Sequence, residues 1–433
     1  MKPFTRRRAG WKGILLLTAA VAAVDAYSAQ EPPIETRQVP GERMPSEVPP
    51  EPETETGGLH VGNFRIHPGL LVTGYYDDNL YVTDTNHVDD LVTVVSPSVL
   101  VHSDWDKHFL NLDAGADIAR YANHDTEDHE HYHVSSEGRF DFSNTANAFG
   151  GIRYYHDTED RESPDAVFGA TPTQYDDVGS YGGVFGQFNR VSVRLGGTFQ
   201  QLSFDNVQSL LVGGVPLGTI NNHDRNRELY TGGANVSYFI APGRVVFVQA
   251  AGDFRRYADA VDDFGFKRDS DGYRILAGTN LSWGGLLDAE LYVGYMQQYY
   301  NDPTFKNFGA PAFGATIDWY ANQDTTVSLY ADRSLEETTA FGSSGYLNSV
   351  GGVQIQHEFT GKFSGSVRAA YTASEFQNID RTDYFIFVGA SLRYLLNQYT
   401  YLQTDYQHRN LDTNIPTQDF DRNQFFLRLS LNY

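Results

Sequence analysis

The chain has 433 residues, a formal net charge of -23 at pH 7 and no cysteine. The negative charge argues against a nucleic-acid partner, because a polyanion would be repelled, and the absence of cysteine excludes disulfides and thiolate metal sites. Aromatic residues make up 14% of the chain, there are 41 glycines, and beyond the N-terminal segment no apolar run reaches the roughly 18 residues that a membrane helix needs. This composition favours one large β-barrel.

The first 28 residues predict a secretory signal peptide. Lys2, Arg6 to Arg8 and Lys12 precede an apolar run over residues 14–24, and small residues follow it. This order of basic, apolar and small residues is typical of a cleaved export signal. The apolar run is too short to span a membrane as a helix.

Residues 29–63 predict a disordered periplasmic tail. The segment is rich in Pro and Glu, as at 49–52, and has no apolar periodicity. Such a segment cannot bury enough apolar surface to offset the entropy lost on ordering. We expect a spacer; a docking tail for a periplasmic partner is the alternative.

Residues 64–433 predict a closed antiparallel transmembrane β-barrel of about eighteen strands. Runs of about ten residues alternate between apolar and polar side chains, and turn residues separate the runs. An even number of strands brings both termini to the same side of the membrane. The predicted strands are 65–76, 91–102, 108–121, 132–142, 148–157, 178–188, 190–203, 228–240, 245–257, 272–283, 286–300, 311–321, 325–333, 346–358, 363–375, 383–395, 399–409 and 423–433.

The connections between these runs alternate in length. Short breaks such as 284–285 and 397–398 contain turn residues, whereas the breaks that alternate with them, such as 158–177 and 204–227, are mostly longer and more acidic. Outer-membrane barrels have short periplasmic turns and longer extracellular loops, so we expect the long breaks outside. The lumen should be open unless 158–177 or 204–227 folds inward.

The two faces of each predicted strand differ in polarity. A charged residue at the bilayer midplane costs about 2 to 4 kcal/mol on the lipid face, so charged strand residues should face the lumen. Such a mixed wall should select weakly by charge, while acidic loops outside should favour cations; wall ion pairs that merely fill the interior are the alternative. The predicted lumen-lining residues are Asp113, Asp117, Glu137, Arg139, Asp141, Arg153, Arg194, Arg274, Asp288, Glu290, Arg368, Arg393, Asp405 and Arg428.

Histidines are concentrated in the segment 124–133. His129, His131 and His133 are weak metal candidates, because imidazoles and carboxylates this close can hold a divalent ion. In an external loop such residues are more often only solvated charge, so we assign no metal site. No catalytic site or cofactor motif is assigned either: Ser349 and His357 lie too far apart along one strand to touch.

The last nine residues alternate strictly and end on an aromatic residue. Their polar face is interrupted only by Phe426. This pattern resembles the signal that outer-membrane assembly machinery reads, so the expected partners are that machinery and the lipid bilayer, in the outer membrane of a Gram-negative bacterium. The residues of the predicted assembly signal are Phe425, Leu427, Leu429, Leu431 and Tyr433.

The first hairpin carries a family resemblance. Its residues 66–72 read Ile-His-Pro-Gly-Leu-Leu-Val, 75–81 read Tyr-Tyr-Asp-Asp-Asn-Leu-Tyr, and 96–100 read Ser-Pro-Ser-Val-Leu. The chain resembles a family of outer-membrane β-barrel porins often associated with exopolysaccharide or capsule export. The resemblance implies passage of exopolysaccharide across the outer membrane and contact with periplasmic polysaccharide-export components, and no enzyme activity. A general diffusion porin and a plugged structural or adhesive barrel are the alternatives.

Overall fold

The computed structural model describes residues 58–433, apart from 168, 210, 213–214 and 217. The predicted signal peptide and most of the predicted tail lie outside the described residues. Within the segment assigned to the tail, Leu59–Val61 form a short strand, β1, which pairs with β2. Strand β1 continues the ladder of β2 beyond the end of the last strand, which pairs with β2 only from Gly69 onward.

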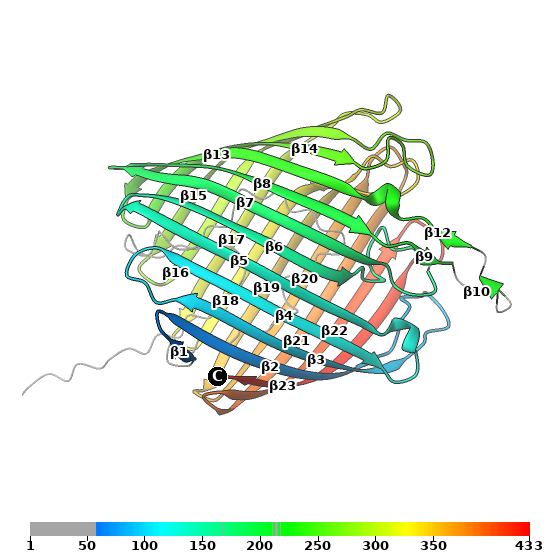
Figure 1. Ribbon diagram of the computed structural model, residues 1–433, viewed down its shortest axis with the longest axis horizontal. Coiled ribbons are helices and arrows are strands. Elements are labelled where there is room, and N and C mark those ends of the chain that lie inside the picture. The colour runs from blue at the N-terminus through cyan, green and yellow to red at the C-terminus, as the bar shows by residue number, and fades with distance from the viewer. Residues whose placement is uncertain (1–57, 168, 210, 213–214, 217) are drawn as a thin grey trace, which may run out of the picture.

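Eighteen long antiparallel strands in the described part of the chain form a closed barrel (Figure 1). Strand β2 pairs with β3 on one side and with β23 on the other, which closes the ring. This confirms the predicted fold. The strands are β2 (Phe64–Asp77), β3 (Asp90–Ser103), β4 (Phe109–Tyr121), β5 (His129–Ser143), β6 (Ala146–Thr158), β7 (Gln174–Phe188), β8 (Val191–Phe204), β13 (Arg227–Ala241), β14 (Arg244–Tyr257), β15 (Ser270–Trp283), β16 (Leu287–Tyr300), β17 (Phe308–Asn322), β18 (Thr325–Glu336), β19 (Tyr346–Thr360), β20 (Phe363–Phe376), β21 (Thr382–Asn397), β22 (Thr400–Thr413) and β23 (Phe420–Asn432).

The two ends of the barrel differ in their connections. At one end, which we call the turn end, the connections have two to five residues; at the other, the loop end, they have five to 22. The longest connects β8 to β13 and contains β9 (Val207–Gln208), β10 (Leu211–Val212), β11 (Val215–Pro216), β12 (Thr219–Ile220) and the 3-10 turn η2 (His223–Arg225). Its short strands project beyond the rim in Figure 1. A second 3-10 turn, η1 (Asp125–Glu127), lies between β4 and β5.

Several strands extend further toward the loop end than the sequence pattern predicts. Strand β7 begins at Gln174 rather than at 178, and β22 continues to Thr413 rather than ending at 409. The additional residues are largely polar, as in Asp176 and Asp412, so they read as loop in the sequence. They are strand residues because their backbones continue the ladder above the apolar belt, where hydrophobic alternation is not required.

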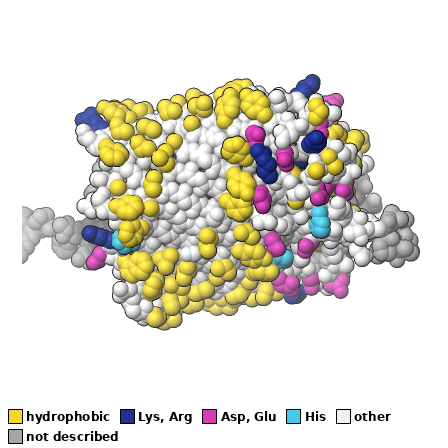
Figure 2. All heavy atoms as spheres, turned by 45° about the horizontal axis from the view of Figure 1, so that its top comes forward, with side chains coloured by type: hydrophobic (Ala, Val, Ile, Leu, Met, Phe, Trp, Pro, Cys, Tyr) yellow, Lys and Arg dark blue, Asp and Glu magenta, His cyan; other side chains and the backbone are white. Residues whose placement is uncertain are grey.

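Hydrophobic side chains form bands and patches on the outer face in view, with white atoms between them, and acidic side chains gather toward the loop end (Figure 2). The apolar side chains of the last strand are on this outer face: Phe425 is 54% exposed and Leu427 57%. Near the turn end, Trp283 is exposed and the rings of Tyr399 and Tyr433 stack. The outer face therefore has the polarity of a surface in contact with lipid.

Among the described residues, no helix is long and apolar enough to cross a membrane.

Candidate functional site: the lumen and its inward loops

The strand register places all fourteen charged residues predicted for the lumen on the inward face. Arg428 pairs with Gln403, which pairs with Arg393, and these positions alternate with the exposed apolar residues of the same strands. The same relation holds around the ring, as for Glu137 opposite Asn111. Whether these residues line a conducting path stays a prediction.

The inward charges are segregated by sign, which the sequence analysis did not anticipate. Among the described residues of β16–β19, the inward carboxylate and guanidinium positions are all acidic; Arg333, the one Lys or Arg in these strands, occupies an outward position. The inward face of β20–β23 has five arginines and two aspartates, Asp383 and Asp405. We call the arginines the basic wall: Arg368, Arg393, Arg409, Arg422 and Arg428. The acids of β16–β19 are Asp288, Glu290, Asp318, Asp332, Glu336 and Glu358.

Aromatic rings lie beside four arginines of the basic wall, of which Arg409 is 5.9 Å from the ring centre of Phe387. The guanidinium carbon of Arg393 is 4.5 Å from the ring centre of Tyr401, and that of Arg428 is 4.6 Å from the ring centre of Phe426. Arg368 lies in the same way over Phe387. Stacking of this kind attracts the cation to the ring face and limits its motion. These guanidinium groups are therefore held against the wall.

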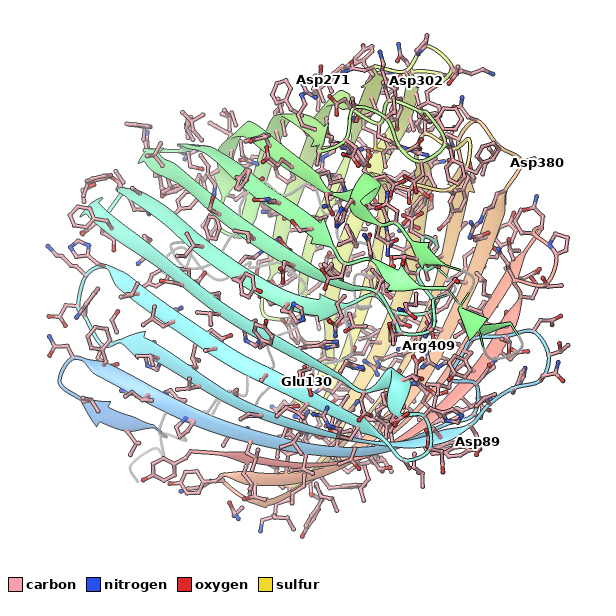
Figure 3. The ribbon with its side chains drawn as sticks, turned by 45° about the vertical axis from the view of Figure 1, so that its right-hand side comes forward. Asp89, Glu130, Asp271, Asp302, Asp380 and Arg409 are labelled. Carbon is pink, nitrogen blue, oxygen red and sulfur yellow. The ribbon has the colours of Figure 1, made fainter. Side chains whose placement is uncertain are left out.

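The connection between β6 and β7, residues 159–173, folds across the mouth of the barrel, and we call it the inward loop. Its Glu162 accepts hydrogen bonds from Nη1 of Arg422 at 2.6 Å and from Nη1 of Arg409 at 3.2 Å. The side chains of all three are at most 10% exposed. Figure 3 shows Arg409 inside the mouth, whereas Asp302 and Asp380 lie at the rim.

Arg422 joins three parts of the molecule. Besides Glu162 of the inward loop, it binds Asp77 at the end of β2: Nε and Nη2 donate to Asp77 Oδ2 at 3.0 and 2.6 Å. The side chain of Asp77 is fully buried and also accepts a hydrogen bond from Gln424. Strand β2, strand β23 and the inward loop therefore meet at the guanidinium group of Arg422.

Two further ion pairs hold the inward loop near its base. Glu159 accepts a hydrogen bond from Nη1 of Arg225 in η2 at 2.9 Å, and both side chains are almost fully buried. Arg161 donates to Glu127 of η1 at 2.6 Å. Buried charges persist when they are paired and hydrogen-bonded. These contacts therefore hold the start of the inward loop to the neighbouring connections on both sides, through η1 and η2.

A second loop meets the inward loop across the mouth. It connects β18 to β19, residues 337–345, and its Thr339 N–H donates to Asp165 of the inward loop at 3.1 Å. Eight strands separate the two loops on one side of the ring and ten on the other. Arg268, in the connection after β14, donates to the carbonyl oxygens of Thr338 and Ser343 at 2.7 and 2.6 Å. The loop end is thus bridged from side to side.

Four residues of this site were not predicted from the sequence: Glu162, Arg409, Arg422 and Asp77. Strand alternation would have found Arg409, which shares the inward parity of Asp405. Arg422 shares the parity of Arg428 but lies one residue before the predicted last strand, which in the structure begins at Phe420. Nothing in the sequence indicates that they bind Glu162, which lies 247 and 260 residues away.

Burial affects the charge state of Glu162. It raises the pKa of this carboxyl above its ordinary value, and Asp160 adds to the effect, although Arg409 and Arg422 act in the opposite direction. The pKa of Asp224, in η2, is raised for the same reason. The inward position therefore disfavours the ionised form of Glu162 compared with water.

Acidification is expected to favour the inward position of the loop. When a carboxyl has a higher pKa in one state than in another, the first state is stabilised at pH values below the lower pKa. This stabilisation is lost as the pH rises through the higher pKa. In water the pKa of Glu162 would return toward about 4.3. Conductance should therefore fall as the pH drops from neutral toward 4, and the change should be smaller in Glu162→Gln. A rise on acidification in wild type would contradict this assignment.

His129, His131 and His133 lie in β5 and not in an external loop, because the strand begins at His129. All three face inward, where polar side chains are tolerated: the rings of His129 and His131 stack, and His133 Nε2 is 2.6 Å from Asp113 Oδ1. Among the described residues, no group of three or more His, Asp and Glu side chains is arranged to hold a metal ion.

Comparison with known proteins gives one family match. The model of a family described as "Putative beta-barrel porin 2" matches residues 51–433. No curated protein matches significantly. Similar solved structures include OccK3 (OpdO) of Pseudomonas aeruginosa, with 13% identity and a TM-score of 0.45, covering 85% of this chain and 96% of that one. OccAB4 of Acinetobacter baumannii has 11% identity and a TM-score of 0.44, with 85% and 98% covered.

Proposed function

The chain belongs to the "Putative beta-barrel porin 2" family, and from that premise we propose that it is a constricted pore for small hydrophilic solutes in the outer membrane of a Gram-negative bacterium. The observation that carries the constriction is the inward loop, which contacts the β18–β19 connection through Asp165 and binds β22 and β23 through Glu162. In this proposal the turn end faces the periplasm and the loop end faces outward, as is usual for such barrels.

The polarity of the interior supports passage of hydrophilic solutes. Charged and amide side chains are concentrated on the inward face, which also carries apolar residues such as Leu276 and Met296, while the exposed apolar residues of the last strands face outward. The inward acids of β16–β19 lie beside the basic wall of β20–β23, so that inorganic ions of either sign find compatible groups. A solute must still pass the inward loop, which favours small molecules over long chains.

Passage of exopolysaccharide is the second candidate. The first hairpin resembles porins associated with that process, and arginines stacked on aromatic rings, as at Arg393 and Tyr401, suit the hydroxyls and apolar faces of sugars. A polysaccharide chain would need the inward loop to leave the mouth. Genes for glycosyltransferases and export components beside this gene would favour this candidate.

Planar-bilayer recording of the purified barrel tests the pore. We expect ion conductance with a weak preference for cations at low salt, because acidic residues surround the loop end while the two walls of the lumen offset each other. The preference should disappear at high salt, since screening acts over about 8 to 10 Å near physiological ionic strength. Absence of any current would refute the proposal in favour of a plugged barrel. Strong anion selectivity would contradict the balance of the walls.

A further inference from the structure

The carboxylate of Glu162 occupies a site built by two arginines of the lumen wall. Arg409 and Arg422 are directly opposite each other on β22 and β23, and their Nη1 atoms converge on one oxygen, Oε1 of Glu162. Both donors are charged, and hydrogen bonds between charged partners are about twice as strong as neutral ones. The wall thus presents a preformed receptor for a carboxylate oxygen.

Neighbouring side chains fix the two arginines so that these nitrogens point at the site. Asp77 binds Nε and Nη2 of Arg422, which leaves Nη1 directed to the inward loop, with Glu162 Oε1 at 2.6 Å and Asp160 Oδ1 at 3.7 Å. Gln407 accepts from Nη2 of Arg409 at 3.0 Å. The receptor is therefore oriented by contacts that do not depend on the inward loop. It would keep its geometry if another carboxylate replaced Glu162.

The site is the outermost step of the basic wall. Arg368 of β20 lies nearer the turn end, where it is opposite Gly389 of β21, which is in turn opposite Gln407 of β22. Arg393 of β21 and Arg428 of β23 lie still nearer the turn end, on either side of Gln403 of β22. Arg422 and Arg428 are six residues apart on one strand, about 20 Å at about 3.3 Å per residue. An anion released from the outer site would therefore meet further guanidinium groups on its way to the periplasm.

We propose that Arg409 and Arg422 bind the carboxylate of an anionic solute, such as a uronate, and that Glu162 occupies this site until the solute displaces it. This inference rests on the proposed pore function and names its solute class. Displacement would remove the contact of the inward loop with β22 and β23, so that binding of the solute and widening of the mouth are coupled.

Single-channel recording with D-glucuronate tests the proposal, with D-glucose as the neutral probe of matched ring size. In wild type, glucuronate should alter the current with saturable concentration dependence, and glucose should not. Arg409→Gln should weaken glucuronate binding about tenfold or more, as expected for loss of a hydrogen bond to a charged group. Glu162→Gln should strengthen it severalfold, because the competing carboxylate is gone while the side chain keeps its size.

Arg256→Gln is the matched control. Arg256 is on the outer face, where it pairs with Asp271, so its loss should leave glucuronate binding unchanged. Calorimetric titration of the same variants in detergent separates the two hypotheses. Glucuronate binding without ion current would overturn the pore and keep the site. Ion current with glucuronate affinity that is the same in wild type, Arg409→Gln and Glu162→Gln would overturn the site and keep the pore.

Discussion

Removal of Phe425–Tyr433 is expected to abolish the folded barrel in the outer membrane. These residues form most of β23, which pairs with β22 and β2 and closes the ring. Without them two strand edges would face lipid with unpaired backbone groups, each costing several kcal/mol. The deletion also removes the predicted assembly signal, so the protein should be degraded in the periplasm. Membrane fractionation and a heat-dependent gel shift measure the outcome.

Ser430→Ala is the control for the truncation. Ser430 is an inward residue of the same strand, so this change keeps the ladder and the outward apolar face. The variant should reach the outer membrane at normal levels. Normal outer-membrane levels of the truncated chain would show that closure by β23 is not required and that the assembly signal lies elsewhere.

Replacing residues 160–167 with a short Gly-Ser linker should raise single-channel conductance severalfold. The change removes Glu162 and Asp165, which tie the inward loop to β22 and β23 and to the β18–β19 loop. The barrel wall should persist, because β6 and β7 remain paired up to Thr158 and Gln174. Swelling of liposomes in sugars of increasing size would show whether the wider mouth also admits oligosaccharides.

The same linker in the β22–β23 connection, residues 414–419, provides the control. Asn414 of that connection hydrogen-bonds to Asp380 and Thr382, and Asp380 lies at the rim in Figure 3, so the replacement should leave the conductance close to wild type. Equal conductance of the inward-loop variant and wild type would mean that the inward loop does not limit the pore.

The barrel could be predicted because lipid imposes a period of two on every strand. In β23, Leu427 and Leu429 must face lipid while Arg428 must not, and the register shows this arrangement. The same rule gave the inward orientation of charged residues around the ring. The rule weakens at the loop end, where His129 and Asp176 continue strands in sequences that read as loop.

The inward loop and its anchors could not be predicted. Glu162 gains its role from Arg409 and Arg422, and their proximity depends on ring closure and on the path of a 15-residue connection. The acidity of the loop indicated only an external position. The sequences of β16–β23 already contain the separation of inward acids from inward arginines. This separation can be recognised as a feature of the lumen only when the neighbours of each strand and its inward-facing positions are both known.

The position of Arg422 has a consequence for the order of assembly. Glu162 is synthesised long before β22 and β23, yet both of its arginine partners are on those last two strands. The inward loop can therefore reach its final place only after β23 has joined β2, a contact between distant parts of the chain that forms slowly. A newly inserted barrel would pass through a wide-mouthed stage before it narrows. Arg422 variants would delay ring closure itself, and Arg409 is the better position for changing the mouth of a finished barrel.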